Sequence, residues 1–255
     1  MIKRLFLSML TIMLIFTTFH SSILAEETSN NEIIEEAKEL IEDTEVVEIR
    51  QDDPLANVFK EYILSKGETI DISGDVFVGV KTGDIITVQF NSSASDTNVT
   101  IFEMQYDLNN EKIISVFKIH YDGTSKEITD YETGETEVIT EDQECTDCSV
   151  SNEEFNEIQD TLQNIEEVAV LQNEIDAILD KQSNTNNENN AENIIFRASA
   201  ICPKGTYSSQ ICKNVPAFSI SKYLACMLVI KKNRTCRAVA SYVKKECVLE
   251  CIPYT

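Results

Sequence analysis

The stretch that decides the fold is residues 76–121, which read VFVGVKTGDIITVQFNSSASDTNVTIFEMQYDLNNEKIISVFKIHY. Its apolar runs are rich in Val, Ile, Thr and aromatic residues and are separated by Gly, Asp, Asn and Ser, which is typical of short strands joined by turns. We expect hairpin turns at Thr82-Gly83 and at 107–110, and weaker strand signals continue through Ile128 and Val138. The strands predicted most strongly are residues 69–72, 76–81, 85–90, 99–106 and 112–121.

Two helices are predicted upstream of these strands. Residues 31–43 place apolar side chains on one side of a helix, and residues 53–67 start with the capping residue Asp53, continue with Pro54 and end at Gly67. We therefore expect residues 26–149 to form an α+β domain, with a small antiparallel sheet and the helices packed on one face.

A single long helix is predicted over residues 152–179, within an amphipathic segment of residues 150–181. Its apolar side chains recur every three or four residues from Phe155 to Ile178, but two consecutive steps of three disturb a heptad repeat. A helix that lies on the domain or on the C-terminal end of the chain is therefore preferred to a coiled coil. Residues 182–200 follow as a polar linker, since 182–193 hold almost nothing apolar.

The first 25 residues have the three parts of a secretory signal peptide. Lys3 and Arg4 precede a mostly apolar run over 5–19, and small residues lead to a predicted cleavage after Ala25. The run of about 15 residues is shorter than the roughly 20 that a membrane-spanning helix needs. We expect the protein to be secreted, so its eight cysteines predict disulfides.

The last 55 residues, 201–255, are predicted to be a small all-α domain held by disulfides. One helix begins at Ser219 or Ser221 and ends near Lys232, and a second begins near Thr235 with its cysteines on one face. In that geometry Cys226 meets Cys236 across the turn, and Cys247 and Cys251 hold Cys202 and Cys212. The cysteines expected to form disulfides are Cys145, Cys148, Cys202, Cys212, Cys226, Cys236, Cys247 and Cys251.

Charge divides the chain at the linker. Residues 201–255 carry nine basic and two acidic residues, net +7, whereas residues 26–200 carry ten basic and 42 acidic residues, net −32. A basic, apolar helical segment is attracted to anionic membranes or to a cell envelope, and an attached acidic region masks it until cleavage. The total charge of −23 argues against nucleic acid as a partner. The residues predicted to form the membrane-active face are Lys222, Tyr223, Leu224, Leu228, Ile230, Lys231, Lys232, Arg234, Arg237, Lys244 and Lys245.

This organisation resembles that of halocin-C8-like bacteriocin precursors, on the strength of the cysteines from Cys202 to Cys251 and the processing region before them. The resemblance implies that the C-terminal piece is an antimicrobial peptide and that the N-terminal piece gives immunity. This tail is more basic than the peptides of that family. A processing protease would cut after Arg197 if trypsin-like, or after Ala200 if it reads small residues; both cuts release nearly the same peptide.

Enzyme signals are weak, and we expect no catalytic residue, no cofactor and no metal site. His120 is expected to be an ordinary surface residue on a strand, and no paired C-x-x-C knuckles of the zinc type occur in the tail. Cys145 and Cys148 have the spacing of a redox dithiol, but acidic neighbours raise a thiol pKa, so a local structural disulfide is preferred. Two other functions stay open: an uncleaved envelope-binding module, and an inhibitor or receptor-ligand type of disulfide domain.

Overall fold

The computed structural model describes residues 33–68, 70, 75–91, 98–123, 125–139, 149–185, 206–232, 234, 236 and 239–253. Several of the predictions fall on other residues, so the structure has no bearing on them. Outside the described residues lie the signal peptide with Ala25, most of the strand expected over 69–72, Cys145, Cys148, most of the linker, Arg197, Ala200, Cys202 and Arg237.

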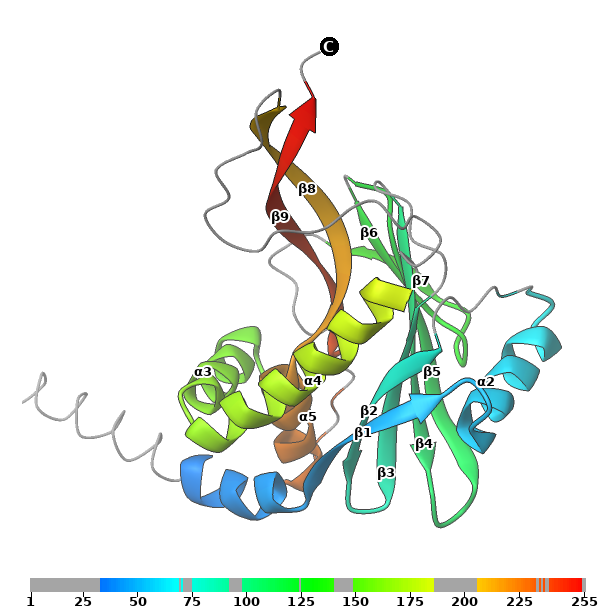
Figure 1. The fold of residues 1–255 in the computed structure, drawn as a ribbon. Coiled ribbons are helices and arrows are strands. Elements are labelled where there is room, and N and C mark those ends of the chain that lie inside the picture. The colour runs from blue at the N-terminus through cyan, green and yellow to red at the C-terminus, as the bar shows by residue number, and fades with distance from the viewer. Residues whose placement is uncertain are drawn as a thin grey trace, which may run out of the picture.

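An antiparallel sheet of seven strands, each paired with its neighbours in sequence, forms the centre of the described part of the chain (Figure 1). The expected small sheet is therefore wrong: β1, with charged residues at three of its seven positions, was not predicted at all, and β6 and β7 lengthen the sheet further. The strands are β1 (Thr44–Arg50), β2 (Val76–Thr82), β3 (Ile85–Asn91), β4 (Val99–Asp107), β5 (Lys112–Tyr121), β6 (Lys126–Asp130) and β7 (Thr136–Ile139).

The two expected hairpin turns are present. Thr82 pairs with Ile85 across a two-residue turn whose Gly83 has φ +58°, a backbone conformation that glycine adopts without steric cost. At the second turn, the Asp107 carboxylate accepts hydrogen bonds from the backbone N–H groups of Asn109 and Asn110, both at 3.0 Å. Short turns of this kind fix the register of the central strands.

Helix α2 (Pro54–Ser65) covers one face of the sheet. The side chain of Asp53 accepts a hydrogen bond from the Leu55 N–H at 2.9 Å, and Gly67 follows the helix at φ +80°, as the sequence predicts. The fully buried Phe59 stacks on Phe90 with ring centroids 4.0 Å apart. Phe59 and Ile63 of α2 lie in one apolar core with residues of this face such as Val88.

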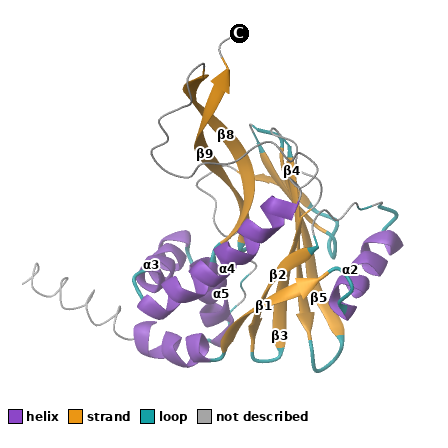
Figure 2. Ribbon diagram, viewed as in Figure 1, coloured by secondary structure: helices purple, strands orange, loops and turns teal. Residues whose placement is uncertain are grey.

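On the opposite side of the sheet, four helical segments form one core with strand β2 (Figure 2). They are residues 33–42, α3 (Asn152–Gln163), α4 (Glu166–Thr185) and α5 (Ile220–Lys231). The single helix expected over 152–179 is broken at Asn164 and Ile165. Leu162 of α3 and Val168 of α4 are six residues apart, so they would lie on different sides of one straight helix. Because of the break, both are buried in the same core.

The predicted all-α C-terminal domain is wrong. Its described part is a long two-stranded ribbon, β8 (Thr206–Phe218) and β9 (Ser241–Pro253), with α5 inserted between the strands (Figure 1). Cys247 and Cys251 are four residues apart, and that spacing places two side chains on one face of a strand as well as of a helix. Only the pairing with β8 distinguishes the two, since Cys212 lies directly opposite Cys247.

Candidate functional site

The face of the sheet opposite α2 is unusual because polar side chains are buried on it beside apolar ones such as Val78, Val80 and Ile101. On β3, Thr87, Gln89 and Asn91 alternate with the apolar residues that contact α2, and on β4 Glu103 does the same. Burying polar groups is costly unless they find hydrogen-bond partners. We call this surface the polar sheet face; its buried members are Thr82, Thr87, Gln89, Asn91, Glu103 and Ser115.

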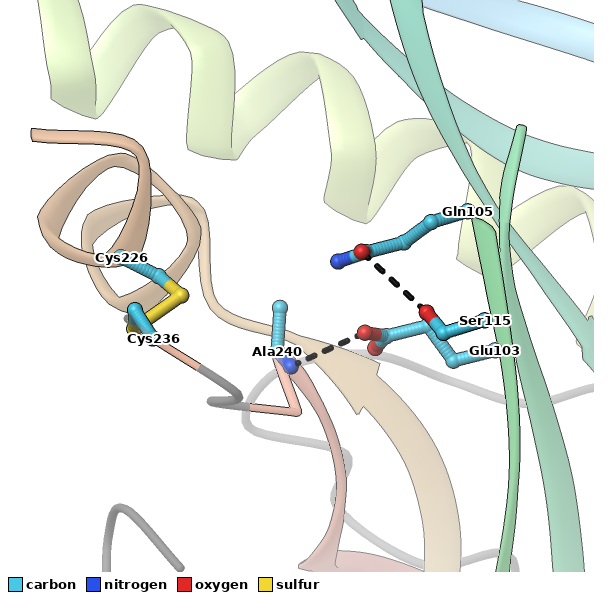
Figure 3. The surroundings of a disulfide bond; sticks show 6 residues. All are labelled: Glu103, Gln105, Ser115, Cys226, Cys236 and Ala240. Carbon is cyan, nitrogen blue, oxygen red and sulfur yellow. Dashed lines mark hydrogen bonds between the residues drawn. A yellow bond between two sulfur atoms is a disulfide. The ribbon is translucent and has the colours of Figure 1, made fainter. Parts of the chain in front are cut away.

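Part of the described C-terminal segment, residues 206–253, packs on this face and supplies several of those partners. Glu103 is 0% exposed, and its carboxylate accepts hydrogen bonds from the backbone N–H groups of Ser241 at 2.7 Å and Ala240 at 3.4 Å. Figure 3 shows the bond from Ala240. Burial raises the pKa of Glu103, and the bonds from Ser241 and Ala240 oppose that rise, as does the charge of Lys222. The buried carboxylate therefore holds the start of β9 through its main chain.

Two further contacts join the segment to the same face. The Ser241 hydroxyl and the Gln89 side-chain carbonyl are 3.1 Å apart, and the Gln89 amide is oriented by its bond to Asn91 at 3.1 Å. The Tyr223 hydroxyl lies 3.0 Å from the hydroxyl of Thr82, and burial raises the pKa of Tyr223 to about 12. These contacts lie on three neighbouring strands, β2, β3 and β4.

Gln172 of α4 binds the corner between β8 and α5 from the other side. Its amide nitrogen donates to the carbonyl of Phe218 at 2.9 Å, and its amide oxygen accepts from the N–H of Ile220 at 3.1 Å. The side chain of Ser219 caps α5 by accepting from the N–H of Lys222 at 3.2 Å. Both ends of the corner are therefore fixed by side-chain amide and hydroxyl groups.

The middle of α5 is apolar and buried. Leu224 and Ala225 are 0% exposed and lie in one core with Phe155 of α3, Ile175 of α4 and Val80 of β2. Burying a Leu side chain of this kind stabilises a fold by about 1.5–3 kcal/mol relative to leaving it in water. The acidic region thus surrounds α5 on several sides.

At the C-terminal end of α5 the contacts are ionic. Lys231 lies 2.6 Å from Glu39, Lys232 lies 2.7 Å from Glu36, and Arg234 lies 2.6 Å from Glu154. All three pairs join a basic residue of the C-terminal segment to an acidic residue of the N-terminal region. Exposed pairs contribute only about 0–1 kcal/mol each, so they add little stability. They show instead that the charges of the two surfaces are complementary.

The described disulfides lie within the C-terminal segment. Cys226 is bonded to Cys236, the pairing expected across the turn, and Cys212 is bonded to Cys247 (Figure 3 shows the first). Disulfides are typical of oxidising compartments, so this finding is consistent with an extracellular protein. Neither bond ties the segment to the described part of residues 33–185.

The residues predicted to form a membrane-active face do not form one exposed surface in this structure. Tyr223, Leu224 and Leu228 are buried against the acidic region, and only Ile230 among the predicted apolar members is clearly exposed, at 42%. The predicted basic members are divided between two elements. Lys222 and Lys231 lie on α5, Lys232 and Arg234 follow it, and Lys244 and Lys245 lie on β9.

Other predicted groups have ordinary surroundings. His120 lies on β5, half-buried, with its Nδ1 atom 3.0 Å from the hydroxyl of Thr100. Within the described ranges, no three His, Cys, Asp or Glu side chains are grouped so that they could hold a metal ion. Nor is any helix there long and apolar enough to cross a membrane.

Sequence reasoning did not find Gln89, Glu103 or Gln172 as binding residues. Polar residues that alternate with apolar ones in a strand usually face solvent, and the alternation over 86–91 and 102–106 gave that signal. The C-terminal segment and α4 cover this face instead. Comparison with known proteins adds no relative: no family model, no curated protein and no solved structure matches the chain.

Proposed function

We propose that the chain is an exported precursor in which an acidic region, residues 26–200, folds around a basic, disulfide-bonded C-terminal peptide. Cleavage between residues 185 and 206 would release that peptide as a bacteriocin-like toxin that acts on the anionic membrane or envelope of a target cell. The observation that carries the proposal is the position of α5: its apolar surface is buried against the acidic region, and the lysines at its C-terminal end are ion-paired with that region.

The nature of α5 supports membrane activity after release. Apolar residues occupy almost every position from Tyr223 to Ile230, so the helix has no polar side to present to water. A helix that is apolar all round is stable only when it is buried in protein or in lipid. At 12 residues it is about 18 Å long, too short to cross a bilayer, so it would act at the interface or in oligomers.

The polar sheet face supports a separable arrangement. If the segment leaves, Gln89 and Glu103 become hydrated, which offsets part of the cost of exposing Val80 and the other apolar residues that α5 covers. The same surface could then bind a second peptide and give the producing cell immunity. Masking and immunity would thus use one set of contacts.

The deep burial of α5 favours a second function, that of an uncleaved envelope-binding module. A helix that forms the centre of the core shared by residues 33–42, α3 and α4 also suits a protein that is never cut. In that case the projecting β8–β9 ribbon, linked by Cys212–Cys247, would be the binding part of a secreted envelope-binding module.

Leakage of dye from vesicles of anionic lipid tests the proposal. The intact chain should leave the vesicles closed, and the C-terminal peptide separated from cut chain should open them, less strongly in vesicles of neutral lipid. A separated peptide that leaves anionic vesicles intact would reject the toxin and favour the envelope-binding module.

A further inference from the structure

Three polar contacts between the C-terminal segment and the sheet fall on adjacent strands. Tyr223 contacts Thr82 on β2, Ser241 contacts Gln89 on β3, and the N–H groups of Ala240 and Ser241 point to Glu103 on β4. Gln89 and Glu103 are directly opposite each other in the register of β3 and β4. The two side chains therefore act on the same short stretch of main chain at residues 240–241.

Burying a carboxylate at position 103 costs free energy. Taking a charge out of water costs several kcal/mol, and an apolar pair of similar volume is often at least as stable. The N–H groups of Ala240 and Ser241 offset the desolvation cost of Glu103. They can do so only when the start of β9 is in this position. A group of this kind contributes selectivity: a peptide in another register would leave the carboxylate buried and unpaired.

Gln89 makes the contact depend on the side chain at position 241. Its nitrogen donates to Asn91, so its oxygen is directed at the Ser241 hydroxyl. Together the pair requires two free N–H groups and one hydroxyl at residues 240–241. Proline at either position, or an apolar residue at 241, lacks one of them.

We propose that Gln89 and Glu103 are the specificity-determining residues by which the acidic region recognises the C-terminal segment of its own sequence and retains it after the chain is cut. The inference rests on the proposed function, because it concerns the state that follows cleavage. The partner it names is the 240–241 stretch of a cut copy of this chain.

The experiment uses the full chain with a site-specific protease sequence placed within residues 186–192, folded with its disulfides intact and then cut. The release of the C-terminal piece is followed by size-exclusion chromatography, at a urea concentration where wild-type release can be timed. Glu103→Gln keeps the shape but presents an amide donor to the main-chain donors. It should release the piece about 10-fold to 100-fold faster, as for a buried donor left without an acceptor.

Ser241→Ala is the gentler variant and tests the same site if Glu103→Gln does not fold. It should speed release by about 3-fold to 10-fold, and Gln89→Ala combined with Ser241→Ala should be no faster than the stronger single change. Glu127→Gln, at an exposed position on β6, removes a carboxylate from the same sheet and should leave release unchanged.

The inference is overturned if Ser241→Ala and Glu103→Gln release the piece at the rate of Glu127→Gln, or if the Gln89 and Ser241 effects simply add. It is also overturned if the wild-type pieces separate at once without urea. These outcomes concern binding alone, so they are distinct from an inactive peptide in the vesicle assay, which would reject the proposed function.

Discussion

Replacement of Leu224 by Ala tests whether the C-terminal segment is part of one cooperative structure with the acidic region. Leu224 is 0% exposed at the centre of α5 and contacts a core that includes residues of α3 and α4. The change removes three carbon groups at about 0.8 kcal/mol each, and an unfilled cavity raises the total to about 3–4 kcal/mol. The folding equilibrium constant should fall by a factor of about 100 or more.

Urea unfolding of the full oxidised chain measures this loss. The chain has no Trp but has eight Tyr, so circular dichroism and tyrosine fluorescence report on the transition. Ile230→Ala is the matched control, since Ile230 is on the same helix but 42% exposed and should cost less than about 1.5 kcal/mol. A loss below about 1 kcal/mol for Leu224→Ala, or two separate transitions in the wild type, would refute the packing of α5 described above.

Three other predictions concern single contacts. Gln172→Ala removes both hydrogen bonds at the β8–α5 corner and should lower the unfolding free energy by about 1–3 kcal/mol in the same urea assay; no change would show that the corner is held elsewhere. Burial raises the folded pKa of Glu103, so the stability it contributes is present below its unfolded pKa of 4.5 and is lost as the pH rises through the folded value. The stability of Glu103→Gln relative to wild type should therefore increase from pH 4.5 upward, and a decrease would contradict the raised pKa. Replacing Cys212 and Cys247 together by Ser should lower stability by about 2–4 kcal/mol in urea, and equal stability with and without the bond would mean that the ribbon does not depend on it.

Local signals predicted the parts of the fold that local interactions determine. Asp53 and Gly67 mark the ends of α2, and Gly83 marks the first hairpin, because caps and turns depend on a few neighbouring residues. The expected contact between Cys226 and Cys236 is present because ten residues separate them across one turn. In each of these cases the chain needs no distant partner.

The errors fall where distant partners decide the structure. Residues 241–253 carry a cysteine spacing that suits a helix, but thirteen paired positions with β8 make them a strand. The polar residues on β3 and β4 suit a solvated face, but a segment more than 130 residues away covers Glu103. Sequence spacing alone contains no information on such a contact.

Cleavage of the chain is the step that the precursor proposal requires, and an intact-mass spectrum of the secreted material shows whether it occurs. The spectrum should contain a species that corresponds to about residues 198–255 and gains two hydrogens for each disulfide on reduction. It should be accompanied by the acidic region that begins near Glu26. If the secreted material is only the chain from Glu26 to Thr255, the precursor proposal is contradicted, and the uncleaved module becomes the better description.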